Sequence, residues 1–200
     1  MDLRQGPLPE AETQLIIKKV VCGLNSIYEK NIIHRDLNIN NVVIHLPTLE
    51  PTETDLLDPM SYIKKLIVER ESLLNDLTKV DFQVKIIDYG LSKLLFNGML
   101  ADTPHGTIEL IAPEVLDAGY DHRVDIWGVG VMFYMLIALD YMFDTKNQPQ
   151  QGKWCISTNL NYSIEALRFI NETVQFDRGR RHFPNKLVDH PYFKTDVTKQ

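Results

Sequence analysis

The run His34-Arg35-Asp36-Leu37 is followed by Asn41 and, further along the chain, by Asp88-Tyr89-Gly90. An aspartate, an asparagine five residues later and a second aspartate before a glycine provide a proton acceptor and the oxygen ligands that Mg²⁺ prefers. Each residue alone is better explained by a turn, because Asp and Asn side chains bond to nearby backbone groups. Together the three predict a site that holds Mg²⁺ and nucleotide phosphates for phosphoryl transfer.

These residues resemble the H-R-D-L-x-x-x-N catalytic loop and the D-F-G metal loop of eukaryotic protein kinases, with Tyr89 in place of phenylalanine. Further blocks follow in the family's order. Residues 106–114 resemble the G-T-x-E-x-x-A-P-E end of an activation segment, and residues 125–130 resemble the D-x-W-S-x-G opening of a buried helix. Residues 177–181 and 190–193 are similar to the D-P-x-x-R and H-P-x-F motifs that close a kinase domain.

The resemblance implies an α+β, protein-kinase-like fold: a mostly α-helical large lobe with a short β-hairpin that carries the catalytic and metal-binding loops. The sequence contains no G-x-G-x-x-G and no V-A-I-K-like lysine, and the residues before His34 show the apolar spacing of one helix. We therefore expect residues 1–200 to be the C-terminal lobe of a kinase catalytic domain, with the small lobe absent.

Two short β-branched runs, residues 42–44 and 84–87, are predicted to pair as that hairpin. In the family the hairpin lies beneath the adenine of ATP, so the resemblance makes Val43 the candidate apolar floor of the nucleotide pocket. An insertion of about residues 46–82 separates the two strands.

A helix is expected within the insertion, over residues 58–77. Asp58 is a candidate N-cap with Pro59 at the first helical position, and an apolar stripe that includes Ile63 and Ile67 follows. Two interpretations remain open: the helix is a docking site for a partner, or it folds back onto the lobe.

The resemblance also implies roles for single residues. Asp36 orients the substrate hydroxyl and accepts its proton, while Asn41 and Asp88 bind Mg²⁺ and, with it, ATP. Asn38 stands where most serine/threonine kinases have a lysine that contacts the transferred phosphate. Loss of that cation is expected to cost on the order of 3 kcal/mol of transition-state stabilisation. The predicted catalytic residues are Asp36, Asn38 and Thr107. The last of these fits a serine/threonine kinase rather than a tyrosine kinase.

Arg35 and Thr103 are the candidate regulatory residues. An arginine directly before the catalytic aspartate is typical of kinases that are activated by phosphorylation, because a guanidinium can bind a phosphate with two hydrogen bonds. The hypothesis is that phosphorylated Thr103 binds Arg35. The alternative is an ordinary loop threonine before Pro104.

Four further residues are expected to be structural. Glu114 and Arg181 match the buried ion pair that ties the activation segment to the base of the lobe. His34 and Asp125 match positions that brace the catalytic loop from below.

Composition supports one globular domain, because 44% of the 200 residues are apolar. A net charge of −6 argues against a nucleic-acid partner. The two cysteines make no disulfide framework, and the apolar run over residues 126–139 is shorter than a bilayer span. The N-terminal residues lack the plan of a signal peptide. We therefore expect a soluble, intracellular protein in the cytoplasm without a membrane segment.

The favoured function is that of a serine/threonine protein kinase, which uses ATP and Mg²⁺ and acts on a protein substrate. One alternative is a truncated or pseudokinase-like regulatory fragment that serves as a scaffold. Another is a small-molecule phosphotransferase of the choline or aminoglycoside type. The blocks at 106–114 and 125–130 argue against the latter, because such enzymes lack an activation segment that docks a peptide.

Overall fold

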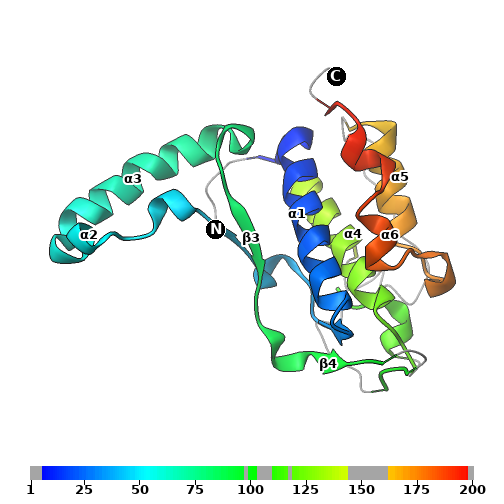
Figure 1. Cartoon of the computed structure of the whole chain (residues 1–200). Coiled ribbons are helices and arrows are strands. Elements are labelled where there is room, and N and C mark those ends of the chain that lie inside the picture. Colours follow the sequence, from blue (N-terminus) through cyan, green and yellow to red (C-terminus); the bar gives the residue numbers. More distant parts are fainter. Residues whose placement is uncertain (1–5, 97–98, 103–109, 117–118, 144–161, 198–200) are drawn as a thin grey trace.

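The computed structural model describes residues 6–96, 99–102, 110–116, 119–143 and 162–197, which form a mostly helical lobe with a few short strands (Figure 1). The expected α+β, protein-kinase-like class is confirmed. The helices are α1 (Glu10–Tyr28), α2 (Glu53–Leu57), α3 (Pro59–Asn75), α4 (Arg123–Ala138), α5 (Ile164–Thr173) and α6 (Pro184–Leu187). The strands are β1 (Ile32–Ile33), β2 (Val42–His45), β3 (Gln83–Ile86) and β4 (Lys93–Leu94).

Helix α4 is the centre of the hydrophobic core. Its sequence is apolar on every side, as expected of a helix that is covered all round, and most of its residues are buried. Helices α1 and α5 pack against it. Helix α1 contributes one apolar stripe, whose buried members are Ile16, Ile17, Val20, Val21 and Leu24. Full burial of each such side chain contributes about 1.5–3 kcal/mol, so this packing holds the lobe together.

Two glycines let α4 approach its neighbours closely. A Cβ atom on Gly128 would overlap the carbonyl oxygen of Leu37, in the loop that also holds Asp36. A Cβ atom on Gly130 would overlap the side chains of Thr173 and Val174 at the end of α5. Gly128 therefore sets the distance between α4 and the Asp36 loop, and Gly130 sets the distance between α4 and the end of α5.

Replacing Gly128 with alanine is expected to destabilise the protein by about 1–3 kcal/mol, because the added methyl group meets backbone that cannot rotate away. Thermal unfolding of the variant measures this loss. Gly6, whose Cβ would meet nothing within 4 Å, provides the matched control. Equal melting temperatures for Gly128→Ala and Gly6→Ala would contradict the close packing.

The predicted hairpin is present. Strands β2 and β3 are antiparallel, with Val42 opposite Ile86, Val43 opposite Lys85 and Ile44 opposite Val84. Alternate residues of the pair, among them Val42 and Ile86, pack against the core. Val43 lies on the opposite face and is 41% exposed. A second short pair, β1 with β4, joins the two ends of the region that contains the site.

The segment between β2 and β3 leaves the lobe as an arm formed by α2 and α3 (Figure 1). The expected start of α3 is observed, since Asp58 accepts a hydrogen bond from the Ser61 N–H at 3.2 Å and Pro59 is the first helical residue. The chain returns to the core at Leu77, which is buried. The fold-back interpretation is wrong for Ile63 and Ile67, which remain about half exposed, at 46% and 56%.

None of the helices within the described residues combines the length and the apolar character needed to cross a membrane.

Candidate active site

Asp36 is held by two asparagine side chains. Its Oδ1 accepts a hydrogen bond from Asn38 Nδ2 at 3.1 Å, and its Oδ2 accepts one from Asn41 Nδ2 at 2.8 Å. Both amides also donate to the Asp36 carbonyl oxygen. Asn38 Oδ1 in turn accepts from the Asn40 N–H at 2.9 Å and so caps the short 3₁₀ turn Ile39–Asn41. The catalytic-loop carboxylate therefore has a defined orientation, because each of its oxygens has a fixed donor.

Asp125, at the start of α4, supports this loop from below. Its carboxylate accepts hydrogen bonds from the backbone N–H groups of His34 at 2.8 Å and Arg35 at 2.9 Å. Arg35 has a positive φ of 71°, a conformation that costs energy in a residue with a side chain. The two hydrogen bonds help to hold that turn. Burial raises the pKa of the Asp125 carboxyl from its ordinary value of 3.8 to about 6.

This raised pKa predicts how stability depends on pH. Between about pH 4 and pH 6 the folded protein keeps the Asp125 proton that the unfolded chain has already lost, so the free energy of unfolding falls as the pH rises. Asp125→Asn removes this titration. We expect the unfolding free energy of the wild type, measured relative to Asp125→Asn by urea denaturation, to fall by about 3 kcal/mol from pH 4 to pH 7. A difference that stays constant over this range would contradict the raised pKa.

His34 joins the catalytic loop to the metal loop. Its side chain is fully buried, its Nε2 lies 2.9 Å from the Ile87 carbonyl oxygen, and its ring meets Tyr89 edge to face at 5.1 Å. The Asp36 N–H donates to His34 Nδ1 at 3.3 Å. With its hydrogen on Nε2, the ring donates to the Ile87 carbonyl oxygen and accepts from the Asp36 N–H at Nδ1. His34 therefore links the two loops through its side chain.

Asp88 follows β3 in a left-handed conformation, with φ 60° and ψ 72°. Its side chain is exposed, and Oδ1 accepts from the Gly90 N–H at 3.2 Å. One residue earlier, the Ile87 N–H donates to the Asn41 carbonyl oxygen at 2.9 Å. This bond brings the metal loop against Asn41. The Asn41 NH₂ group is bonded to Asp36, so its amide oxygen is left to accept; this oxygen and the Asp88 carboxylate are of the kinds that Mg²⁺ prefers.

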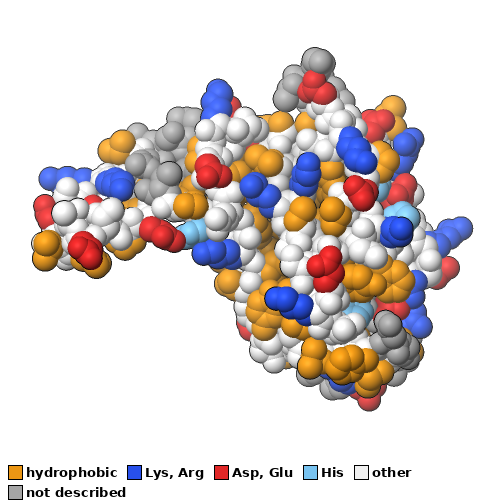
Figure 2. Space-filling model, in the orientation of Figure 1, with side chains coloured by type: hydrophobic (Ala, Val, Ile, Leu, Met, Phe, Trp, Pro, Cys, Tyr) orange, Lys and Arg blue, Asp and Glu red, His pale blue; other side chains and the backbone are white. Residues whose placement is uncertain are grey.

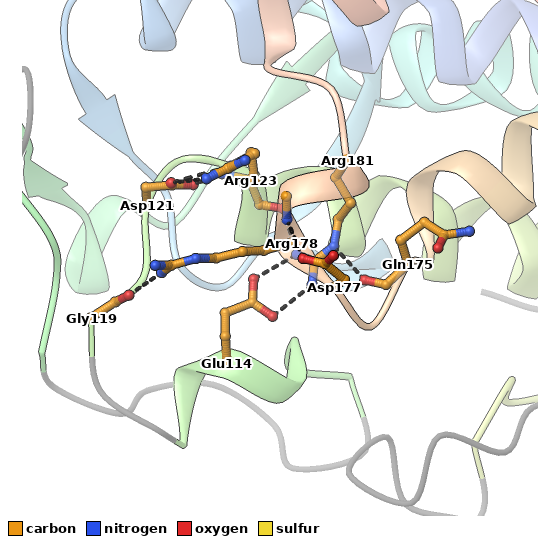
Figure 3. A network of polar contacts seen from close by, with 9 residues as sticks. Glu114, Gly119, Asp121, Arg123, Gln175, Asp177, Arg178 and Arg181 are labelled. Carbon is orange, nitrogen blue, oxygen red and sulfur yellow. Dashed lines mark hydrogen bonds and ion pairs between the residues drawn. The ribbon is translucent and has the colours of Figure 1, made fainter.

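The structure also brings Glu114 and Arg181 together (Figure 3). Arg181 Nη1 and Nη2 each lie 2.6 Å from one Glu114 carboxylate oxygen. Arg181 Nε donates to the Gln175 carbonyl oxygen at 2.7 Å, Nη1 donates to that of Arg123 at 2.9 Å, and the guanidinium lies over the Trp127 ring. The arginine side chain is fully buried and the glutamate side chain is 12% exposed. This pair ties the end of the 110–116 segment to the closing part of the chain.

A shallow pocket opens beside Asp36. Catalytic-loop atoms form one wall, and apolar residues of the 110–116 segment and α4 form the other. Its lining includes Asp36, Asn38, Leu110, Ile111, Val115 and Val124. The sequence interpretation missed the pocket because its two walls lie far apart in the chain. Apolar residues on both sides of the Ala112-Pro113-Glu114 block were the only available signal.

Of the predicted regulatory and specificity residues, the structure describes Arg35 but not Thr103 or Thr107. Arg35 is half-buried, and its Nε donates to the Leu91 carbonyl oxygen. Just before the undescribed residues 103–109, Asp102 forms an ion pair with Lys93, whose Nζ lies 3.4 Å from Asp102 Oδ1.

Comparison with known proteins identifies the family. The protein kinase domain model matches residues 1–193, and the chain belongs to the protein kinase family. Enzymes of this family generally use ATP and Mg²⁺.

Individual relatives are serine/threonine kinases or other protein kinases. The chain is 27% identical to the DNA damage response protein kinase DUN1 of Saccharomyces cerevisiae, over 99% of this chain and 37% of the relative. It is 29% identical to the serine/threonine-protein kinase cds1 of Schizosaccharomyces pombe, over 99% and 39%. It is 27% identical to myosin light chain kinase A of Dictyostelium discoideum, over 97% and 58%. The chain thus spans less than two thirds of the length of these relatives.

Proposed function

We propose that this chain is the catalytic region of a serine/threonine protein kinase, which transfers the γ-phosphoryl group of ATP to a hydroxyl of a protein substrate. The observation that carries the proposal is the Asp36 carboxylate, fixed by Asn38 and Asn41 at the edge of a partly apolar pocket. Relatives named as serine/threonine kinases support the choice of substrate hydroxyl.

In this mechanism Asp36 orients the attacking hydroxyl and takes up its proton. The pocket beside it receives the substrate side chain and its neighbour, with Leu110, Ile111 and Val115 as the apolar wall. Asn38 supplies a neutral hydrogen-bond donor in place of the lysine that is usual in the family. The missing charge predicts a slower reaction, by a factor of about one hundred.

The Asn41 amide oxygen and the Asp88 carboxylate would hold Mg²⁺, with ATP phosphates and water completing its coordination. Bound Mg²⁺ supplies neutralisation of the charge that develops on the transferred phosphoryl group. Val43 is exposed on the outer face of the β2–β3 pair, where an apolar side chain can support the adenine ring. In this proposal the described elements form the large lobe of the catalytic domain, with residues 46–82 as an insertion.

The test of this function is phosphate transfer by the full-length protein. With labelled ATP, Mg²⁺ and a mixed pool of serine and threonine peptides, we expect phosphoserine or phosphothreonine to form. Chelation of Mg²⁺ with EDTA is the control and should stop the transfer. Binding of ATP without any transfer, in protein whose fold is intact by circular dichroism, would favour the regulatory scaffold instead.

We also propose that phosphorylated Thr103 binds Arg35. A guanidinium has five N–H donors, and within the part of the chain that the structure describes only Nε of Arg35 is engaged, with the Leu91 carbonyl oxygen. We expect peptide mass analysis of active full-length protein to find phosphate on Thr103, and Thr103→Ala to lower activity about tenfold or more. Active protein that never carries phosphate at this position would exclude this role for Thr103.

A further inference from the structure

Helix α3 carries an apolar ridge that the described part of the chain leaves uncovered. The ridge consists of Met60, Ile63 and Ile67, which are 63%, 46% and 56% exposed. Their spacing of three and four residues places them on one side of the helix. Helix α3 belongs to the arm that projects away from the lobe (Figure 1), and hydrophobic, acidic and basic side chains lie together toward the end of that arm (Figure 2).

The helix is anchored locally, so the ridge has a defined shape. Thr52 and Asp55 form a reciprocal capping box at the start of α2, and Asp58 caps α3. The hydroxyl of Tyr62 donates to the Leu49 carbonyl oxygen at 2.6 Å, which ties α3 to the 3₁₀ turn Pro47–Leu49 at the start of the arm. A surface that is already ordered loses little conformational entropy when a partner binds it.

The charges around the ridge are complementary to those of a second copy of the same helix. The tip of the arm is acidic, with exposed Glu53 and Asp58, whereas exposed Lys64 follows next to the ridge. When two such helices run antiparallel about a two-fold axis, the lysine side of each approaches the acidic start of the other. A parallel pair would place like charges opposite one another, which is unfavourable.

The spacing of the ridge fits the same arrangement. An antiparallel register that sets Met60 of one copy against Ile63 of the partner subunit forms two equivalent apolar layers. The same register brings Ile67 toward the tip of the second arm, where Leu56 and Leu57 are 68% and 85% exposed. This register therefore uses exposed apolar residues of both α2 and α3.

We propose that two copies of this chain associate through the ridge formed by Met60, Ile63 and Ile67, as an antiparallel α3 pair in which Met60 packs against Ile63 of the partner subunit. The inference does not depend on the proposed kinase activity. The contact is small, so the dimer is weak, with an area below about 1,200 Å² and a dissociation constant in the micromolar range.

Analytical ultracentrifugation of the full-length protein tests the proposal. The wild type should shift from monomer to dimer as its concentration rises through the micromolar range. Met60→Glu and Ile63→Lys should each weaken self-association at least about tenfold, because each places two unpaired charges in the apolar layers. An equimolar mixture of these variants should form a heterodimer, in which one layer pairs Glu with Lys and the other keeps the native residues.

Val68→Glu is the matched control, because Val68 is 68% exposed on α3 but lies about 100° around the helix from Ile67. This variant should dimerise like the wild type, and circular dichroism checks that every variant keeps its helix. A wild type that stays monomeric, variants that dimerise unchanged, or a mixture that forms no heterodimer would each overturn the proposal.

Discussion

Replacing Arg181 with methionine is expected to lower the free energy of unfolding by about 3–5 kcal/mol. Methionine keeps much of the volume over Trp127 but removes every hydrogen bond of the guanidinium. The change leaves the Glu114 carboxylate without its partner and removes the guanidinium donor from the carbonyl oxygens of Gln175 and Arg123. A largely buried charge that has lost its ion pair is among the most destabilising features of a folded protein. Urea denaturation followed by fluorescence measures the loss.

The control is Arg180→Met, one residue earlier on the exposed surface, which should change stability by less than about 0.5 kcal/mol. Adding Glu114→Gln to Arg181→Met should recover part of the lost stability, since the unpaired charge is then removed. A loss below about 1 kcal/mol in Arg181→Met would show that solvent reaches this pair and that it contributes little. The 110–116 segment would then be held mainly by apolar contacts.

Replacing Asp36 with asparagine is expected to reduce kcat by a factor of about 10²–10⁴, if the proposed kinase activity is correct. The amide has the size of the carboxylate but cannot take up the proton of a substrate hydroxyl. It also sets an NH₂ group against the amide of Asn38 or Asn41, so one of the two contacts is lost. Steady-state phosphorylation of a peptide substrate measures kcat, while binding of ATP, which does not need this proton transfer, should change little.

Asp81→Asn is the matched control, because Asp81 is an exposed aspartate outside the site and should leave kcat unchanged. Unfolding temperature should be similar in both variants. If Asp36→Asn retained the activity of the wild type, Asp36 would be excluded as proton acceptor. If neither the wild type nor the variant transferred phosphate, the scaffold alternative would be supported.

Much of the lobe could be predicted from local patterns. The antiparallel partners of residues 42–44 follow from two short β-branched runs, and the start of α3 follows from Asp58 and Pro59. Uniform apolar character was enough to predict that α4 is buried. These features depend on backbone preferences and side-chain alternation over a few residues, which the order of amino acids carries directly.

Two features of the site could not be predicted from local patterns. Resemblance to a family placed Asp36, Asn41 and Asp88 near one another, but it did not indicate that Asn38 holds the second carboxylate oxygen of Asp36. The pocket wall made by Leu110 and Val115 also lay beyond sequence reasoning. Both features depend on the distances between separate segments.

The amino-acid sequence by itself determined the family, the order of the loops and the type of the longest elements, among them α3 and α4, because these follow from residue identity and spacing. Tertiary structure alone decided that Asn38 bonds to Oδ1 of Asp36 and that Ile63 is exposed on a projecting arm. The physical reason is that periodicity defines which residues share a face, whereas burial depends on what packs against that face. That partner comes from distant parts of the chain or, as we propose for α3, from a second molecule.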